Sequence, residues 1–345
     1  ISLRAVTSGT SEAVRCAAAS VFEMPCYHPR EARRSETRND RGKYAVWFPR
    51  AGGRPGTGER LGVPITLPCG QCIGCRLSRA RTWGIRGMHE SQMHKENSFI
   101  TLTYRERDLP YGGSLSPKDI RDFMKRLRTW IFRKYGSRVR FLYCGEYGEQ
   151  RGRPHYHIAL FGFQFRDLKP WRKKGGYTLY RSKDLEKLWT MGNCEIGEVT
   201  FESVSYVARY ICKKVTGKGQ DEIDPKTGLR PYEKIDATTG EVIEIEPEFV
   251  RMSLKPGLGH DWFVKFKEDV YPADEIVLRG GQKVKPPAYY DSLLARENPE
   301  LLEKLKQNRK ARAEADPDNT SERLAIRELV QEFKMQKLIR ELESS

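Results

Sequence analysis

Residues 139–162 read VRFLYCGEYGEQRGRPHYHIALFG, two apolar runs separated by a segment rich in glycine. The runs at 139–146 and 155–162 carry the β-branched and aromatic residues that are typical of strands. Between them, the glycines and the proline of 148–154 indicate a turn. The stretch therefore predicts a β-hairpin, in which the two strands pair antiparallel.

Elements on both sides of this hairpin predict the fold class. They are, in order, a strand at 98–104, a helix capped by Ser116 and Pro117 and ended by Gly136, a short helix at 182–191, a strand at 194–201 and a helix at 203–215. With the hairpin, the order becomes β-α-β-β-α-β-α. Strands joined in this way indicate an α+β fold, with helices packed on an antiparallel sheet.

The charge of the chain points to a polyanionic partner. Its 345 residues carry a formal net charge of +16, and the excess lies within residues 1–216. This concentration favours nucleic acid as the partner, although a basic soluble surface has the same composition. The sequence lacks the G-x-x-x-x-G-K-[ST] motif, which argues against an NTP-driven motor in this chain. No run approaches about 20 apolar residues, so no membrane partner is expected.

A cluster of three cysteines precedes the first predicted strand. Eight cysteines in a chain of this length are too few for a disulfide framework, which indicates a reducing compartment. Cys69, Cys72 and Cys75 stand three residues apart, and Cys26 or His28 would complete a tetrahedron for structural Zn²⁺. An iron–sulfur cluster fits the same spacing, and so do three reduced cysteines without a metal.

Basic side chains follow the cysteines directly. Residues 77–94 have apolar residues at loosely helical spacing. We expect the arginines in and beside this segment to contact DNA phosphates, the alternative being a solvated basic helix face. These arginines are Arg76, Arg79, Arg81 and Arg86.

The second strand of the hairpin opens with two histidines that suit a metal. Alternation puts His155 and His157 on one face, with imidazoles about 6–7 Å apart. Glu146 lies nine residues before His155, a separation that lets the two face each other across the hairpin. Together they predict a three-ligand site for Mg²⁺ or Mn²⁺ acting on phosphate, or for zinc. The alternative is a pair of hydrogen-bonded strand histidines.

Two tyrosines on the following helix suit a nucleophile. Tyr206 and Tyr210 are four residues apart, so their hydroxyl groups project from one helix face. A tyrosine can attack phosphorus and hold a covalent phosphodiester, given a polarised phosphate or a nearby cation. Lys213 or Lys214, one turn further on, would supply that cation. The alternative is that both tyrosines simply pack on the sheet.

In combination, these motifs resemble the HUH endonuclease superfamily. The resemblance rests on Gly145-Glu-x-Gly-x-x-x-Gly-x-Pro-His-Tyr-His157, on the preceding strand at 99–104 and on Tyr206-x-x-x-Tyr210-x-x-Lys213. The double tyrosine is similar to that of the replication initiators of microviruses. MPCYHP at 24–29, LPCGQCIGCR at 67–76 and MHE at 88–90 resemble the N-terminal region of gokushovirus initiators. The resemblance covers about residues 24–342.

The resemblance implies a rolling-circle nickase on a central five-stranded antiparallel sheet with flanking helices. His155, His157 and Glu146 would hold the metal, and one tyrosine would attack the scissile phosphate of single-stranded origin DNA. This leaves a 5′-phosphotyrosine and a 3′-OH that primes host DNA polymerase. The second tyrosine then cuts the regenerated origin, and the circle is closed. Because the chain has no helicase motif, a host helicase is the other implied partner, in the cytoplasm of a bacterial host cell.

Two alternatives and a domain organisation complete the expectations. A relaxase or single-strand transposase shares the chemistry, but a relaxase usually has three clustered histidines. A non-catalytic, zinc-containing nucleic-acid-binding protein would need only the basic first two thirds. The expected parts are a disordered or non-native leader at 1–23, a Cys/Arg-rich region at 24–96, an endonuclease core at 97–216, an acidic excursion with the end of the core at 217–284, and a charged helical tail at 285–345.

Overall fold

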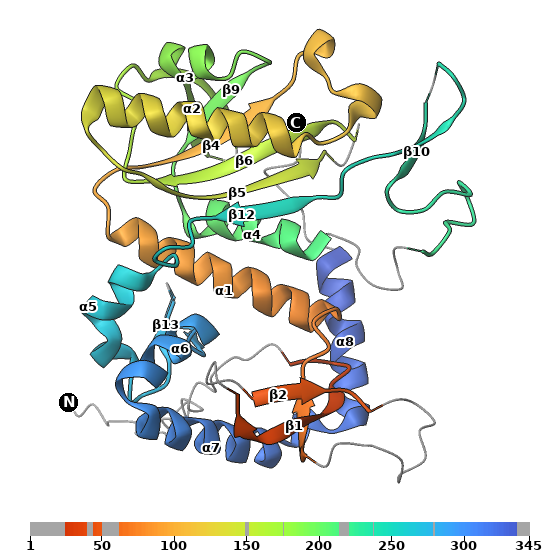
Figure 1. The fold of residues 1–345 in the computed structure, drawn as a ribbon, viewed down its shortest axis with the longest axis vertical. Coiled ribbons are helices and arrows are strands. Elements are labelled where there is room, and N and C mark those ends of the chain that lie inside the picture. Colours follow the sequence, from red (N-terminus) through yellow and green to blue (C-terminus); the bar gives the residue numbers. More distant parts are fainter. Residues whose placement is uncertain are drawn as a thin grey trace, which may run out of the picture.

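The computed structural model describes residues 25–39, 44–49, 62–148, 152–174, 176–213, 221–236, 238–278 and 280–336. Residues 1–23, for which a disordered leader was expected, lie outside these ranges. A large sheet with helices on both faces forms the upper part of Figure 1, and the long helix α1 (Ile73–Gln92) separates it from a lower part. Among the described helices, none combines the length and the apolar character needed to cross a membrane.

The large sheet is antiparallel throughout and confirms a mixed fold of helices and antiparallel strands. In spatial order its strands are β12 (Phe249–Met252), β5 (Arg140–Tyr147), β6 (Pro154–Phe161), β4 (Asn97–Thr103), β9 (Cys194–Gly197), β8 (Tyr177–Arg181) and β7 (Lys169–Lys174). The expected count of five strands is wrong for this sheet, which has seven. β7 was missed because it reads KPWRKK, and a charged edge strand needs no apolar alternation.

The β5–β6 hairpin has the predicted register. Glu146 pairs with His155, and Cys144 pairs with His157. Paired residues share a face of the sheet, so the two histidines and the glutamate lie together. On the opposite face, Tyr156 is fully buried in the main hydrophobic core.

That opposite face is covered by α2 (Pro117–Tyr135) and α3 (Lys183–Leu188) (Figure 1). α2 begins as predicted, because the hydroxyl of Ser116 accepts a hydrogen bond from the backbone N–H of Asp119 at 3.2 Å. It ends at Gly136, whose φ of 66° is the left-handed conformation that favours glycine. Its apolar stripe is buried, and each such side chain contributes about 1.5–3 kcal/mol.

The face that carries Glu146 and the histidines is covered by α4 (Phe201–Lys213), with α1 packed behind it (Figure 1). Two glycines of α1 allow this close approach. A Cβ at Gly84 would collide with the hydroxyl of Ser205, and one at Gly87 would collide with Cγ1 of Val204. Because protein interiors leave no room for an added methyl group, these glycines set how deeply α4 sits against the sheet.

Replacing Gly87 with alanine is therefore expected to displace α4 and to destabilise the protein by about 1–3 kcal/mol, the usual cost of overpacking. Urea denaturation measures this loss. The double variant Gly87→Ala/Val204→Ala removes the colliding methyl group and should recover part of the stability. A single variant as stable as the natural protein would contradict the assigned packing.

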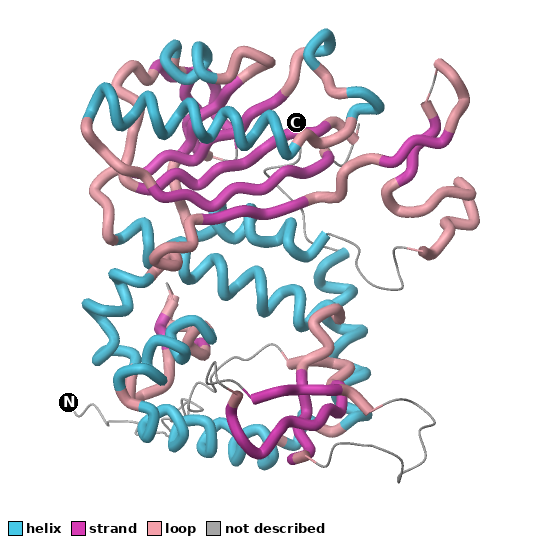
Figure 2. Tube along the Cα trace, viewed as in Figure 1, coloured by secondary structure: helices cyan, strands magenta, loops and turns pink. Residues whose placement is uncertain are grey.

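The lower part contains smaller sheets and the remaining helices (Figure 2). The strands are β1 (Arg30–Arg38), β2 (Tyr44–Trp47) and β3 (Val63–Leu67) in one sheet, with β10 (Glu233–Ile235) pairing β11 (Val242–Glu244) and β13 (Ile276–Val277) pairing β14 (Lys283–Val284). The helices are α5 (His260–Val270), α6 (Ala288–Glu297), α7 (Pro299–Ala315) and α8 (Ser321–Gln336), with 3₁₀ turns at Glu106–Asp108, Tyr111–Gly113 and Pro317–Asn319. The predicted helical character beyond residue 285 is thus confirmed for α6, α7 and α8. The β10–β11 hairpin, in the acidic excursion, extends away from the body in Figure 1.

Candidate functional site

Three side chains from two strands converge on one point above the sheet. Oε1 of Glu146 lies 2.7 Å from Nε2 of His155 and 2.8 Å from Nε2 of His157. One ligand atom from each residue lies within 4.8 Å of the others. Glu146 is only 1% exposed, whereas the His155 side chain is partly open to solvent. The three groups thus form a half-buried site with one accessible side.

The far nitrogen of each imidazole is fixed by a neighbour. Nδ1 of His155 lies 3.0 Å from the carbonyl oxygen of Arg153, and Nδ1 of His157 lies 3.0 Å from Oγ1 of Thr101. A carbonyl can only accept, so Nδ1 of His155 carries a proton and Nε2 of the neutral ring turns its lone pair toward Glu146. Such outer contacts orient histidine ligands in metal sites.

Charge and donor type at this point fit a divalent cation. Burial opposes ionisation of Glu146, but His157 and His155 outweigh it and lower the pKa of the carboxyl group to about 2. Its second oxygen, Oε2, is buried without a hydrogen-bond partner among the described residues. An anionic oxygen and two imidazole nitrogens form a ligand set that Mn²⁺, Mg²⁺ or zinc accepts.

Tyr206 joins this cluster from helix α4. Its hydroxyl group donates a hydrogen bond to Oε1 of Glu146 at 3.0 Å, and the side chain is 5% exposed. Its ring meets the imidazole of His157 edge-on, with centroids 5.0 Å apart. The structure therefore brings one of the two predicted tyrosines into contact with two of the three predicted metal ligands.

The other predicted members of the nucleophile helix cannot be described in this way. The backbone of α4 continues to Lys213. The side chains of Tyr210 and Lys213, and the whole of Lys214, lie outside the described residues. Their roles remain predictions.

Comparison with known proteins places this site in a family. A family model of the replication-associated protein ORF2 matches residues 97–215, which include the three candidate ligands and α4. The replication-associated protein ORF2 of Spiroplasma virus 4 is 33% identical over 244 residues, covering 68% of this chain and 69% of that protein. The chain belongs to this family. Its members include microvirus proteins, as the sequence motifs predicted.

Two further relatives of this replication-associated protein come from other phages. The replication-associated protein VP4 of Bdellovibrio phage phiMH2K is 35% identical over 68% of this chain and 70% of its own length. The replication-associated protein ORF4 of Chlamydia phage 1 is 32% identical over 66% of this chain and 53% of its own length. No solved structure matches. The identity of the family therefore rests on sequence.

This family member has a second cluster of candidate ligands where α1 begins. The sulfur atoms of Cys26, Cys69, Cys72 and Cys75 all lie within 4.8 Å of one another. His28, the alternative fourth ligand, instead pairs with Glu328 of α8 at 2.7 Å. Four sulfurs in this arrangement form the ligand set of a structural zinc site.

Backbone N–H groups surround these sulfurs and favour thiolates. The N–H of Cys69 donates to Sγ of Cys26 at 3.1 Å, and that of Tyr27 donates to Sγ of Cys72 at 3.4 Å. Burial raises the pKa of Cys69, but N–H donors from Cys72 and Gln71 outweigh it and lower this pKa to about 7. Thiolates are the form in which cysteine binds metal.

Changing Cys72 to serine is expected to reduce the bound zinc by more than half and to lower the folding yield, because zinc holds such sites together. Elemental analysis of the purified protein measures the metal. Cys194→Ala is the matched control, since Cys194 is buried in the main core, away from the cluster. Pure, reduced natural protein without zinc or iron would rule out a structural metal here.

The four arginines after the cysteines differ in their surroundings. Nη2 of Arg79 donates to the carbonyl of Gly70 at 3.1 Å, and burial lowers the pKa of Arg81. Arg76 is half-buried.

Arg86 is 8% exposed, and its guanidinium lies between the rings of Trp83 and Tyr289. Contrary to the expectation, Arg86 is thus unavailable to phosphate, because α1 is covered on several sides rather than lying on the surface.

Thr101 is the functional residue that the sequence reasoning missed. It pairs with His157 across β4 and β6, and its hydroxyl group contacts the imidazole of that histidine. Its position in an alternating strand could have indicated the shared face, had the pairing of β4 with β6 been known.

Proposed function

We propose that this protein initiates rolling-circle replication by nicking single-stranded origin DNA through a 5′-phosphotyrosine, on a sheet of the HUH endonuclease type. The observation that carries the proposal is the hydrogen bond from Tyr206 to Glu146, which puts a potential nucleophile inside the Glu146–His155–His157 cluster. Two packing tyrosines and two ordinary strand histidines would have no reason to meet around one buried carboxylate.

In this proposal, Glu146, His155 and His157 hold Mg²⁺ or Mn²⁺. When bound, that ion supplies positive charge that polarises the scissile phosphate. The hydroxyl oxygen of Tyr206 attacks phosphorus, a bond forms between them, and the bond from phosphorus to the 3′ oxygen breaks. The hydroxyl proton leaves, and the released 3′ oxygen gains one. The reverse reaction joins the strands, so one chemistry serves both cutting and closing.

Glu146 positions Tyr206 more than it activates it. A carboxylate with a pKa of about 2 holds the hydroxyl hydrogen but is a weak base for a phenol with an ordinary pKa of about 10. The phenolate therefore needs positive charge nearby. We assign this role to Lys213 or Lys214, and the second transfer to Tyr210.

The remaining parts of the proposal concern the whole chain. We assign nicking to residues 97–216, metal-stabilised support to 24–96, and scaffolding to 217–284 and 285–345, with 1–23 as a leader. Arg76, Arg79 and Arg81 are the candidates for phosphate contact. Host DNA polymerase and helicase are the proposed partners in the bacterial cytoplasm, because no P-loop motif occurs in the sequence.

The experiment that tests this function uses supercoiled circles that carry the cognate origin. Incubation with the protein and Mg²⁺ or Mn²⁺ should yield open circles nicked at one position, with protein attached at the 5′ side. Primer extension maps the nick, and protease treatment removes the adduct. Cleavage at random positions, or a free 5′ phosphate at the nick, would contradict the proposal.

A further inference from the structure

One face of the β1–β3 sheet combines arginine side chains with aromatic rings. Arg34 of the central strand β1 pairs with Val46 of β2, and alternation puts Arg30, Tyr44 and Phe48 on that same face. The guanidinium of Arg30 lies 4.2 Å from the centroid of the Phe48 ring, and that of Arg34 lies 4.4 Å from the centroid of the Tyr44 ring. The two stacked pairs thus stand side by side.

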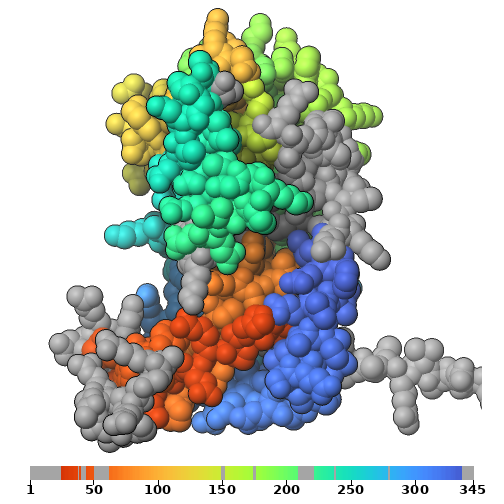
Figure 3. Space-filling view, turned by 90° about the vertical axis from the view of Figure 1, so that its right-hand side faces the viewer, coloured from red at the N-terminus to blue at the C-terminus, as the bar shows by residue number. Residues whose placement is uncertain are grey.

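This face is open to solvent. Phe48 is 46% exposed, Val46 48% and Tyr44 37%, high fractions for apolar and aromatic side chains on a sheet. Figure 3 shows the red segment at residues 25–49 reaching the surface next to α8. In the part of the chain that the structure describes, neither Arg30 nor Arg34 forms an ion pair with a carboxylate. Both guanidinium groups therefore keep their charge available for an anion.

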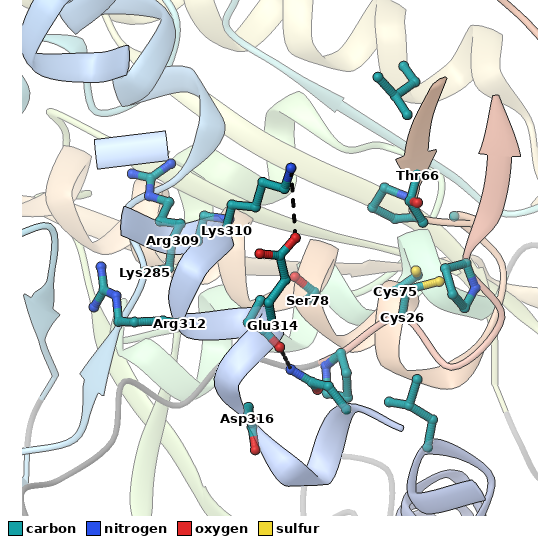
Figure 4. Close-up of a pocket in the computed structure, with 18 of the residues that line it drawn as sticks. Cys26, Thr66, Cys75, Ser78, Lys285, Arg309, Lys310, Arg312, Glu314 and Asp316 are labelled. Atoms are coloured by element: carbon teal, nitrogen blue, oxygen red, sulfur yellow. Dashed lines mark hydrogen bonds and ion pairs between the residues drawn. The ribbon is translucent and has the colours of Figure 1, made fainter. Parts of the chain in front are cut away.

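The large hollow beside this sheet is less suited to a polyanion. It measures about 1840 Å³ and lies between β3 and α7, with Thr66 and Cys75 on one side (Figure 4). Its cations are already held by carboxylates: Lys310 pairs with Glu314, and Arg309 pairs with Asp274. A phosphate would have to displace these partners, which the arginines of the β1–β2 face do not require.

We propose that the Arg30/Arg34 face of the β1–β3 sheet is a second binding surface for single-stranded DNA, separate from the nicking site. Exposed aromatic rings stack on bases, and arginines contact phosphates and add cation–π attraction. A duplex keeps its bases stacked inside and cannot offer them to Tyr44 and Phe48. The inference rests on the proposed function only for the choice of DNA as the nucleic acid.

The cysteine cluster gives this surface a fixed position. Cys26 precedes β1 and Cys69 follows β3, while Cys72 caps the start of α1. One metal at this cluster would therefore join both ends of the small sheet to α1. In Figure 1, α1 stands between this sheet and the strands β5 and β6 that carry the nicking site. A strand bound to both surfaces would be held at two points on opposite sides of α1.

The test measures the affinity of the full chain for a fluorescent oligothymidine of about 30 nucleotides, by anisotropy, without origin sequence or nicking. Tyr44→Ala/Phe48→Ala should weaken binding at least about tenfold, since each base–aromatic stack contributes substantially. Arg30→Gln/Arg34→Gln should make the slope of log affinity against log salt shallower by about 1.4, or 0.7 for each phosphate contact. The matched control is Phe132→Ala, an exposed ring of α2 with Arg138 beside it.

Several outcomes would overturn the proposal. Natural affinity in both double variants, with zinc content and melting temperature unchanged, would do so. An equal loss in Phe132→Ala, or an equal loss for a duplex probe, would do so as well. Variants that change only the oligomeric state would make the face a contact between copies. Cleavage of a short origin oligonucleotide should stay at the natural rate in both variants, so failure of this proposal is distinguishable from failure of the proposed function.

Discussion

Replacing His157 with alanine is expected to lower the rate of origin nicking at least about a thousandfold. A metal at such a site stabilises several kcal/mol of charge in the transition state, and each 1.36 kcal/mol corresponds to a factor of ten. Quantitative cleavage of labelled origin DNA measures the rate. DNA binding, measured separately, should change little, because the DNA-binding arginines lie on other elements.

The control for this variant is His260→Ala, a histidine at the start of α5 that pairs only with its neighbour Asp261 among the described residues. It should nick at the natural rate. Glu146→Gln keeps the size of the side chain and removes its charge, so it should demand more metal for half-maximal nicking while retaining some activity. Full nicking by His155→Ala/His157→Ala in the presence of a chelator would refute the metal assignment.

Replacing both Tyr206 and Tyr210 with phenylalanine is expected to remove the covalent protein–DNA adduct entirely. Phenylalanine keeps the edge-on contact of Tyr206 with His157 and loses only the hydroxyl oxygen. A single change should leave some nicking, since the second hydroxyl can serve, but should block the coupled transfer that closes the circle. Gel analysis of adducts and closed circles on the same origin substrate separates the two effects.

Tyr177→Phe is the matched control, because this half-exposed tyrosine lies in the same sheet, at the turn between β7 and β8. It should form adduct normally. Mass spectrometry of the trapped peptide identifies the attached residue. DNA linked anywhere other than position 206 or 210 would refute the nucleophile assignment, and undiminished adduct in the double variant would show that the tyrosines only pack.

Features set by local period were predictable from the sequence. The Glu146–His155 pairing follows from counting along a two-residue period across a short turn, because a slip of one residue would move either side chain to the other face. The start of α2 likewise depends only on Ser116 and the proline after it. Such features need no knowledge of what the element packs against.

Features set by tertiary placement were not predictable. Arg86 has the same sequence context as the exposed arginines of a basic helix, and only the packing of α1 between two layers buries it. Cys26 and His28 fit the cysteine pattern equally well, and the choice depends on Glu328, which lies far along the chain. Thr101 reaches His157 only through the strand order of the sheet. These residues depend on contacts that sequence spacing does not encode.

Helix α1 links two regions whose relative angle is fixed by its length. It begins beside Cys75 and reaches Gly84 and Gly87, against which α4 rests. Each residue of an α-helix turns the chain by about 100°. Inserting or deleting one residue between Cys75 and Gly84 would therefore rotate the cysteines about 100° around the helix axis relative to the seat of α4. No substitution elsewhere restores that angle, so this stretch should be the part of the chain least tolerant of a change in length.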